Sequence, residues 1–197
     1  MRRQNERMTV DTAAAPPRQF DEDLILIDRF LEGERGAFDA IYGKYYDRVY
    51  AIAKGILLDS EDAADATQEA FTLMHRNLRR FHRRSRLSTW IFRIAVNTAI
   101  QETRRHKNRK KTEAIDQAAE VPAPTIDVPA PDPRVEAAMR NLKPADRAIL
   151  TLFYWDDATV AEISETLGCS LNATKTRLFR AREHFKAAYS LGETGDE

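Results

Sequence analysis

The sequence predicts an all-α fold of two small helical domains joined by a flexible, acidic, proline-rich linker. Apolar residues recur at steps of three and four, and no stretch alternates with a period of two. Segment 112–133 holds five acidic residues, no basic residue and five of the eight prolines, a composition typical of a tether. With 197 residues, 43% of them hydrophobic and 31% charged, the chain is long enough for two such domains.

Four helices are expected in the first domain. A short helix around 24–31 ends before Gly33 and Gly36. The next helix carries one apolar stripe, made of Phe38, Ile41, Tyr45, Val49, Ile52 and Ile56. Asp59 or Ser60 is a suitable N-cap for a helix over 61–78, with an expected core stripe of Ala64, Thr67, Phe71, Met74 and Leu78. Ser88 is expected to cap a fourth helix, which runs to about Arg105.

The second domain has the pattern of a helix-turn-helix. Pro144 fits the first turn of a helix that continues to Phe153 or Tyr154. A short helix over 160–167, a turn that opens with Gly168 and a long basic helix to about Tyr189 follow. In such a motif the second helix enters the major groove of DNA.

The formal net charge of zero hides a strong segregation of charge. Segment 20–75 has 13 acidic and 5 basic residues, whereas segment 76–111 has 13 basic residues and one acidic residue. Segment 170–186 has five basic residues and one acidic residue. Ordinary solvated helix faces mix both signs, so these basic segments favour a polyanionic partner over a merely solvated surface.

Helical geometry places the polar side chains of these segments on defined faces. After Ser88, one arc is expected to hold Arg93, Asn97, Gln101 and Arg104, opposite Ile91, Ile94, Ala95 and Thr98. Trp90 lies at the edge of the polar arc, and its position is compatible both with core packing and with stacking on a base. On the last helix the outward side is expected to hold Lys175, Thr176, Phe179 and Arg180, with Leu178, Ala181 and Phe185 inward.

Several classes of protein and site are excluded by composition. No run approaches the roughly 18 apolar residues of a membrane span, and the N-terminus lacks the apolar stretch of a secretory signal, so a cytoplasmic protein without membrane insertion is expected. Cys169 is the only cysteine, and the four histidines have no metal-ligand spacing. We therefore expect no metal, no cofactor and no small-molecule substrate.

Three stretches resemble a bacterial RNA polymerase sigma factor of the extracytoplasmic-function (ECF) group, which keeps only sigma regions 2 and 4. Asp62-Ala-Ala-Asp65-Ala-Thr-Gln68-Glu69-Ala-Phe71 is similar to the acidic helix that docks on the clamp of the polymerase β′ subunit (beta-prime). The stretch 88–99, which begins Ser88-Thr-Trp90, resembles the helix that engages the minus-ten promoter element. The segments 162–168 and 175–182 resemble the helix-turn-helix that reads the minus-thirty-five element.

The resemblance implies three sets of site residues and no catalytic residue. Binding to core polymerase is assigned to Asp62, Asp65, Gln68, Glu69 and Phe71. The minus-ten set is Phe81, His82, Arg83, Arg84, Ser85, Trp90, Arg93, Asn97, Gln101 and Arg104, in which Phe81, the loop 82–85 and Asn97 would hold a flipped base. The minus-thirty-five set is Lys175, Thr176, Arg177, Phe179, Arg180 and Arg182.

The resemblance also implies a domain organisation and partners. A disordered extension (1–19) precedes the sigma region 2 helical bundle (20–111), the linker (112–133), the sigma region 4 helix-turn-helix (134–191) and an acidic tail (192–197). The expected function is to bind core RNA polymerase through the β′ clamp and the β flap, and to recognise and help melt promoter DNA. A separate anti-sigma factor is expected, because the chain has no inhibitory domain of its own.

Two other functions and two linker roles stay open at this point. A free-standing helix-turn-helix repressor or activator explains the second domain but leaves the acidic helix and the face over 90–99 without a role. A nucleic-acid-processing enzyme needs paired carboxylates in a basic cleft, which the pattern does not provide.

The linker is expected either to act as an acidic mimic of nucleic acid or to be a passive spacer. Asn172-Ala173-Thr174 departs from the family pattern, because Thr174 replaces an apolar residue.

Overall fold

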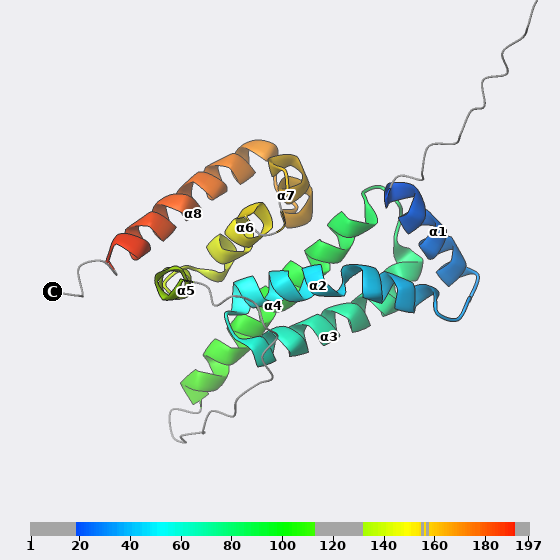
Figure 1. Ribbon diagram of the computed structural model, residues 1–197, viewed down its shortest axis with the longest axis horizontal. Coiled ribbons are helices and arrows are strands. Elements are labelled where there is room, and N and C mark those ends of the chain that lie inside the picture. The colour runs from blue at the N-terminus through cyan, green and yellow to red at the C-terminus, as the bar shows by residue number, and fades with distance from the viewer. Residues whose placement is uncertain (1–18, 113–131, 155, 157, 192–197) are drawn as a thin grey trace, which may run out of the picture.

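The computed structural model describes residues 19–112, 132–154, 156 and 158–191 (Figure 1). Every regular element in these ranges is a helix, which confirms the predicted all-α fold class. Among the described residues, no helix combines the length and the apolar character needed to span a bilayer. The expectations for the N-terminal extension, most of the linker and the acidic tail fall outside these ranges.

The first domain consists of four α-helices and one short 3-10 helix. Helices α2 (Ala37–Leu57), α3 (Ser60–Asn77) and α4 (Leu87–Thr112) pack on one another, and α1 (Gln19–Leu31) lies against α2. The 3-10 helix η1 (Leu78–Arg80) follows α3 directly. The predicted stripe of α2 is buried from Ile41 to Ile56, while Phe38 is half-buried at its start.

Helix α3 begins where its sequence predicts, with one change in the buried face. The Asp59 carboxylate accepts hydrogen bonds from the backbone N–H groups of Glu61 and Asp62, both at 2.9 Å, so Asp59 is the N-cap. The prediction that Ala64 belongs to the core stripe was wrong, because Ala64 is exposed. Helix α3 packs on both α2 and α4, and the alanines buried between these two neighbours are Ala63, Ala66 and Ala70.

Helix α4 is longer at its C-terminal end than its apolar pattern predicts. It begins at Leu87, so Ser88 is its second residue rather than its cap, and it continues to Thr112 instead of ending near Arg105. The extra turns have no apolar stripe, but they are rich in lysine and arginine, which are good helix formers. Side-chain contacts of Arg105 and His106 with α3 hold the start of this extension.

The second domain contains one helix that the sequence analysis did not anticipate. Helix α5 (Pro133–Arg140) precedes α6 (Pro144–Tyr154), α7 (Val160–Leu167) and α8 (Leu171–Leu191). Asp132 caps α5 by accepting from the backbone N–H of Arg134 at 2.9 Å, and proline takes the first helical position. The dipeptide Asp132-Pro133 is therefore a helix start, a signal that the proline-rich composition of the linker concealed.

The helix-turn-helix is formed by α7 and α8. Thr159 and Glu162 form a reciprocal capping box at the start of α7, and Gly168 ends the helix with a left-handed φ of 63°. Thr174 is fully buried, and its hydroxyl donates to the Ser170 carbonyl at 3.0 Å beside the Cys169 sulfur. The hydroxyl of Thr174, which stands where the family pattern has an apolar residue, thus has its hydrogen-bond partner at the start of α8.

Replacing Thr159 by Ala is expected to lower the free energy of unfolding by about 1 kcal/mol, because α7 loses the acceptor for the Glu162 backbone N–H. Urea denaturation followed by circular dichroism measures this change. The control is Thr72→Ala at an exposed position inside α3, where we expect a change within about 0.5 kcal/mol. Equal stability of Thr159→Ala and wild type would contradict the role of the cap.

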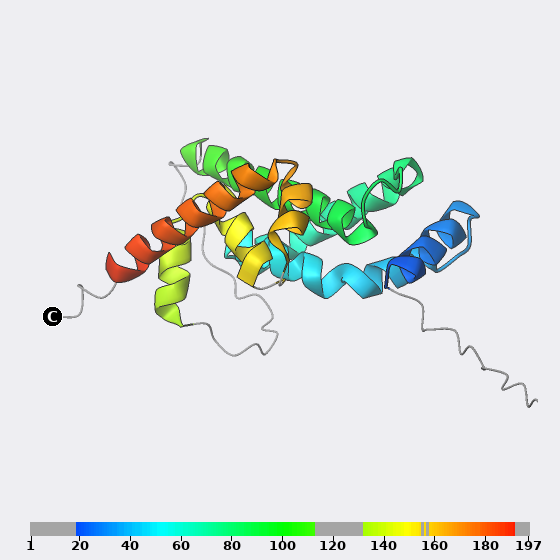
Figure 2. The same ribbon diagram turned by 90° about the horizontal axis from the view of Figure 1, so that it is seen from above.

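The two domains lie against each other (Figures 1 and 2). Helix α6 packs on α2, and α7 packs on α4. The crossing of α2 and α6 depends on Gly55, because a Cβ atom placed there would overlap the side chain of Thr151. A glycine inside a helix lowers helix stability, so this one is explained by the close approach of the second domain.

Candidate functional site

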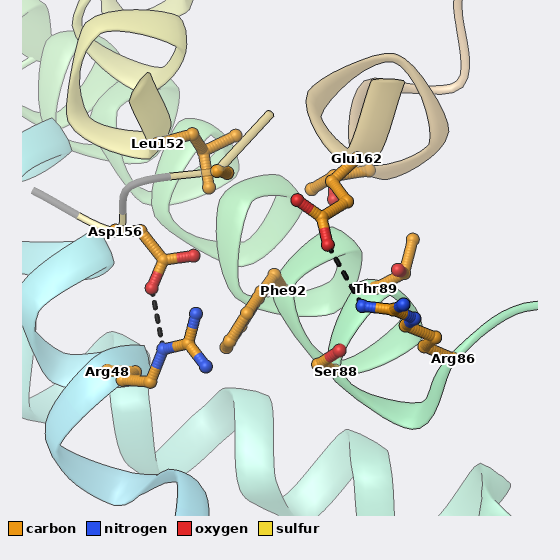
Figure 3. Close-up of a pocket in the computed structure, with 10 residues that line it drawn as sticks. Arg48, Arg86, Ser88, Thr89, Phe92, Leu152, Asp156 and Glu162 are labelled. Carbon is orange, nitrogen blue, oxygen red and sulfur yellow. Dashed lines mark hydrogen bonds and ion pairs between the residues drawn. The ribbon is translucent and has the colours of Figure 1, made fainter. Parts of the chain in front are cut away.

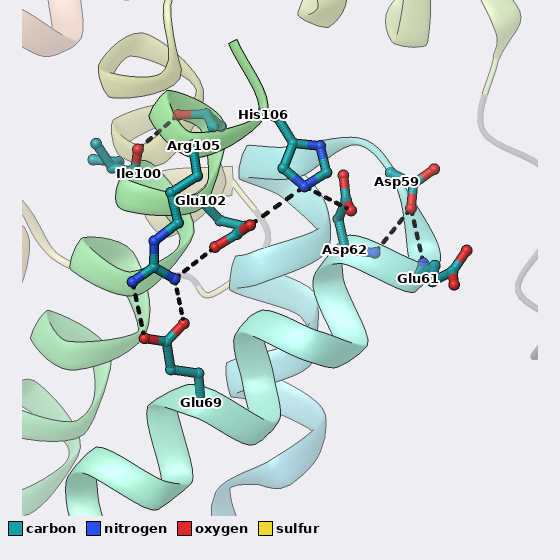
Figure 4. Close-up of polar contacts among 9 residues, drawn as sticks. Asp59, Glu61, Asp62, Glu69, Ile100, Glu102, Arg105 and His106 are labelled. Carbon is teal, nitrogen blue, oxygen red and sulfur yellow. Dashed lines mark hydrogen bonds and ion pairs between the residues drawn. The ribbon is translucent and has the colours of Figure 1, made fainter. Parts of the chain in front are cut away.

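Some acidic side chains of α3 contact α4 (Figure 4), and others are exposed. Glu69 and Asp62 are partly buried and contact the end of α4: Arg105 Nη1 lies 2.9 Å from Glu69 Oε2, and His106 Nε2 lies 3.2 Å from Asp62 Oδ1. Asp65 and Gln68 are exposed, and within the described part of the chain Asp65 makes no ion pair. The negative charge that α3 offers to a partner therefore comes from Asp65 and from Glu61 in the first turn, which is also exposed and forms no ion pair with the described residues.

Glu102 completes the contact between α3 and α4. Its carboxylate lies 2.9 Å from Arg105 Nη1 and 3.3 Å from His106 Nε2. Burial raises the pKa of Asp62; His106 acts in the opposite direction, and nearby carboxylates such as Asp59 raise it further. Three carboxylates thus contact Arg105 and His106 along this seam, which joins the acidic helix to the basic extension of α4.

Phe71 lies in the core rather than on the surface. Its side chain is 3% exposed, and its ring centroid is 4.5 Å from that of Tyr42 and 6.4 Å from that of Tyr46. Tyr42 is 41% exposed, so it provides the aromatic surface next to the acidic face. Tyr42 is not among the predicted site residues, although the four-residue spacing of Tyr42, Tyr46 and Tyr50 was a visible signal.

The polar arc of α4 is arranged as the sequence predicts. On the opposite side Ile91, Ala95 and Thr98 are buried, and Ile94 is half-buried. The four side chains along the arc are exposed: Arg93, Asn97, Gln101 and Arg104. Trp90 is half-buried, with its ring centroid 5.4 Å from that of Phe81. Trp90 therefore packs against the core and still keeps part of its surface accessible.

The loop before α4 is held by α1. Arg83 has a left-handed backbone, with φ of 55°, and its guanidinium pairs with Asp28. His82 and Arg84 are exposed on either side of Arg83, while Ser85 is half-buried. Helix α1 thus contacts the cationic loop to which the resemblance assigns part of the pocket for a flipped base.

Helix α8 presents most of its assigned residues to solvent. Lys175, Thr176, Arg177, Phe179 and Arg180 are all exposed, and Phe179 is 64% exposed. Arg182 differs, because it is half-buried and its guanidinium lies over the rings of Phe153 and Tyr154 of α6, at 4.6 and 5.5 Å. This cation–π packing directs Arg182 to the interior of the domain.

Polar contacts between the domains involve three arginines of the first domain. Arg48 Nε lies 2.6 Å from Asp156 Oδ1, and Arg86 Nη1 lies 3.1 Å from Glu162 Oε1. Arg93 donates to the backbone carbonyls of Glu165 and Thr166 at the end of α7, the second at 3.3 Å. Arg86 belongs to the basic segment 76–111 that favours a polyanionic partner, but neither its pairing nor that of Arg48 was predicted, because their partners lie 76 and 108 residues away.

Glu162 is ionised in this arrangement. Hydrogen bonds from the Thr159 side chain and backbone lower its pKa, and the charges of Arg86 and Arg48 lower it further.

Among the described residues, no group of three His, Cys, Asp or Glu side chains is placed to hold a metal ion.

Comparison with known proteins assigns both domains. Residues 41–109 match sigma-70 region 2, and residues 133–185 match sigma-70 region 4. The ECF RNA polymerase sigma factor SigW of Bacillus subtilis is 30% identical over 172 residues, which cover 80% of this chain and 91% of that protein. The RNA polymerase sigma-H factor of Pseudomonas aeruginosa is 28% identical over 176 residues, which cover 83% and 91% of the two chains.

Two solved structures share the fold. CnrH in complex with the cytosolic domain of CnrY has a TM-score of 0.65 at 21% identity, covering 89% of this chain and all of that one. The sigma factor RpoE of Bartonella quintana, in complex with the anti-sigma factor NepR, has a TM-score of 0.63 at 16% identity, covering 82% and 99%. With both sigma regions matched in order, the chain belongs to the ECF group of sigma-70 RNA polymerase sigma factors.

Proposed function

We propose that this ECF sigma factor binds core RNA polymerase through the exposed face of α3 and directs promoter-specific initiation. The observation that carries the proposal is the separation of charge within the first domain. Asp65 and Gln68 form an exposed surface on α3 that suits a basic protein partner and repels DNA, whereas the exposed arc of α4 carries cationic and amide side chains. We assign the α3 surface to the β′ clamp and the α4 arc to DNA.

The minus-ten element is assigned to the loop before α4 and to its exposed arc. Taking a base out of the stack costs a few kcal/mol, and stacking on an aromatic side chain returns about 1–3 kcal/mol. Trp90 and Phe81 form an aromatic pair that is only partly buried, next to the cationic loop. These groups favour strand separation without driving it alone, so melting requires the polymerase.

The minus-thirty-five element is assigned to the exposed face of α8. Arginine and lysine bind guanine through two acceptors in the major groove, and an apolar ring contacts the thymine methyl group. Lys175, Arg180 and Phe179 are exposed on this face. Arg182 is assigned a packing role instead, because its guanidinium rests on α6.

The domain assignment follows the same division. We assign 20–111 to sigma region 2 and 134–191 to sigma region 4, with the helix-turn-helix domain also contacting the β flap. The chain acts as an initiation factor rather than as a catalyst, and it works in the cytoplasm where the polymerase is. A separate anti-sigma factor is the proposed regulator, since the sigma factor RpoE of Bartonella quintana, which shares this fold, was solved in complex with the anti-sigma factor NepR.

An in vitro transcription assay with core polymerase tests the function. The wild-type chain is expected to confer initiation at one site on a linear promoter template, whereas core polymerase alone initiates at random. A free-standing repressor or activator would add no initiation of its own. If the chain neither binds core polymerase nor changes its start sites on any template of a genomic library, the proposal is wrong.

Asn97→Ala tests the minus-ten assignment within that assay. Loss of one amide that contacts a flipped base is expected to reduce initiation on duplex promoter DNA by about 10-fold, and a template with an open bubble should restore most of it. Asn97 is exposed, so the fold is not at risk. Glu32→Gln, at an exposed position between α1 and α2, is the control. Equal loss on duplex and bubble templates would argue against a role in strand separation.

A further inference from the structure

Helix α1 carries none of the predicted site residues. It precedes residues 41–109, which match sigma-70 region 2. It packs on α2 and α4, and in both overall views it lies at the end of the first domain that points away from α5 and α8 (Figures 1 and 2). What α1 contributes to DNA binding therefore depends on its contacts within the first domain.

A buried polar pair anchors α1 to α2. The Tyr45 hydroxyl donates a hydrogen bond to Asp23 Oδ2 at 2.6 Å, and Lys44 Nζ lies 2.9 Å from Asp23 Oδ1. Tyr45 and Asp23 are 1% and 3% exposed, and Ile27 on the same helix is also buried. Displacing α1 would leave the Asp23 charge without its partners in the interior, so α1 has a fixed position on α2.

The loop 82–85 between η1 and α4 has few polar ties of its own. Within the described part of the chain, its residues make one side-chain contact with another element, the ion pair of Arg83 with Asp28 of α1. Arg86, directly after the loop, pairs instead with Glu162 of the second domain (Figure 3). Asp28 is therefore the polar link between this loop and the rest of the first domain.

The backbone of Arg83 is in a conformation that needs such a link. Its φ of 55° lies in the left-handed region, which is unfavourable for most residues with a Cβ atom and persists where neighbouring contacts hold it. Nη2 of Arg83 contacts Asp28 Oδ1, and Nη1 lies 3.5 Å from Oδ2, so two nitrogens of one guanidinium face one carboxylate. His82 and Arg84 on either side are exposed, and the turn at Arg83 sets the direction in which they point.

We propose that α1 positions the minus-ten loop: Asp28 holds Arg83 in its left-handed conformation, and this conformation directs His82 and Arg84 toward a flipped base. The inference rests on the proposed function for the role of the loop. Arg83 is then a positioning residue whose guanidinium binds α1 rather than DNA. Selectivity for the flipped base thus depends on a helix that does not itself contact the DNA.

The ion pair can be broken without unfolding the domain. The side chains of Arg83 and Asp28 are 40% and 51% exposed, and ion pairs at such positions contribute little to overall stability. The anchor of α1 at Asp23 is separate from this pair and stays intact when Asp28 is changed. Substitution of Asp28 therefore tests the loop and not the fold.

Limited digestion of the free full-length chain with trypsin tests whether Asp28 holds the loop. Asp28→Arg replaces attraction by repulsion from Arg83, so cleavage after Arg84, followed by mass spectrometry, should be about threefold faster. Glu32→Arg makes the same change of charge in the turn after α1 and should leave this rate unchanged. Circular dichroism should show the same helical content in both variants and the wild type.

Base preference of the assembled holoenzyme tests whether the held loop reads DNA. The probes are bubble templates of a promoter that the wild-type chain uses in the transcription assay, with each of the four bases at each minus-ten position. Asp28→Arg should lower the preference at the flipped position by about threefold, while binding to core polymerase stays as in the wild type. A merely structural role would weaken initiation on all bases alike.

The charge swap Asp28→Arg/Arg83→Asp separates positioning from direct contact with DNA. Aspartate adopts the left-handed conformation more readily than most residues, and it can pair with the arginine introduced at position 28. The swapped chain should therefore regain most of the wild-type base preference. If the Arg83 guanidinium bound DNA, an acidic residue in its place would repel the phosphates, and the swapped chain would initiate less well than Asp28→Arg.

Three outcomes would overturn the proposal. Unchanged cleavage of Asp28→Arg would show that α1 does not hold the loop. Faster cleavage with unchanged base preference would show that the loop conformation does not set selectivity. A swapped chain that does worse than Asp28→Arg would assign Arg83 to direct DNA contact. A wild-type chain that does not initiate would refute the proposed function, whereas the digestion needs no polymerase and tests the hold of Asp28 on the loop by itself.

Discussion

Asp65→Arg is expected to abolish binding to core RNA polymerase while the helical content stays unchanged. Asp65 is an exposed acidic residue beyond the first turn of α3, and it forms no ion pair with the described residues. Glu69 and Asp62 already contact Arg105 and His106, so reversing either charge would also disturb the seam between α3 and α4. The single change at Asp65 therefore tests docking without testing the fold.

Co-elution with core enzyme in size-exclusion chromatography measures this effect, and circular dichroism checks the fold. Glu32→Arg makes the same change of charge at an exposed position in the turn between α1 and α2, and it should bind core enzyme normally. Glu69→Arg should weaken binding too, but with a measurable loss of stability through repulsion from Arg105. If Asp65→Arg co-eluted with core enzyme as the wild type does, the assignment of α3 to the β′ clamp would be wrong.

Arg180→Ala and Lys175→Ala should each reduce initiation at promoters that depend on the upstream element, by about 1–3 kcal/mol for a bidentate base contact and less for a phosphate contact. Both side chains are exposed on α8, so neither change affects the core. Initiation measured on a set of single-base variants of the element distinguishes the two kinds of contact. A base contact relaxes the preference at one position, whereas a phosphate contact weakens all sequences alike.

Arg182→Ala is the matched control on the same helix. Its guanidinium packs on the rings of Phe153 and Tyr154, so its loss should lower the stability of the second domain without altering sequence preference. If Arg182→Ala relaxed the preference while Arg180→Ala and Lys175→Ala did not, the recognition surface would lie on a different side of α8.

Local patterns in the sequence specified most helix positions and faces. Pro144, the Asp59 cap and Gly168 mark helix ends by their own backbone chemistry, so these boundaries needed no knowledge of the neighbours. The exposed arcs of α4 and α8 also follow from spacing alone, because a helix places every residue at a fixed angle. The order of the sigma motifs identified the family for the same reason, since each motif is a short run of consecutive residues.

Tertiary packing decided which of these side chains a partner can reach. Phe71 belongs to the docking motif but is buried, because α3 is covered by α2 on one side and by α4 on the other. Arg182 belongs to a basic run but turns to α6. The pairing of Arg48 with Asp156 joins residues 108 positions apart, a separation with no periodicity to reveal it. Spacing along the chain fixes the angle of a side chain on its helix, but only the fold determines what lies opposite.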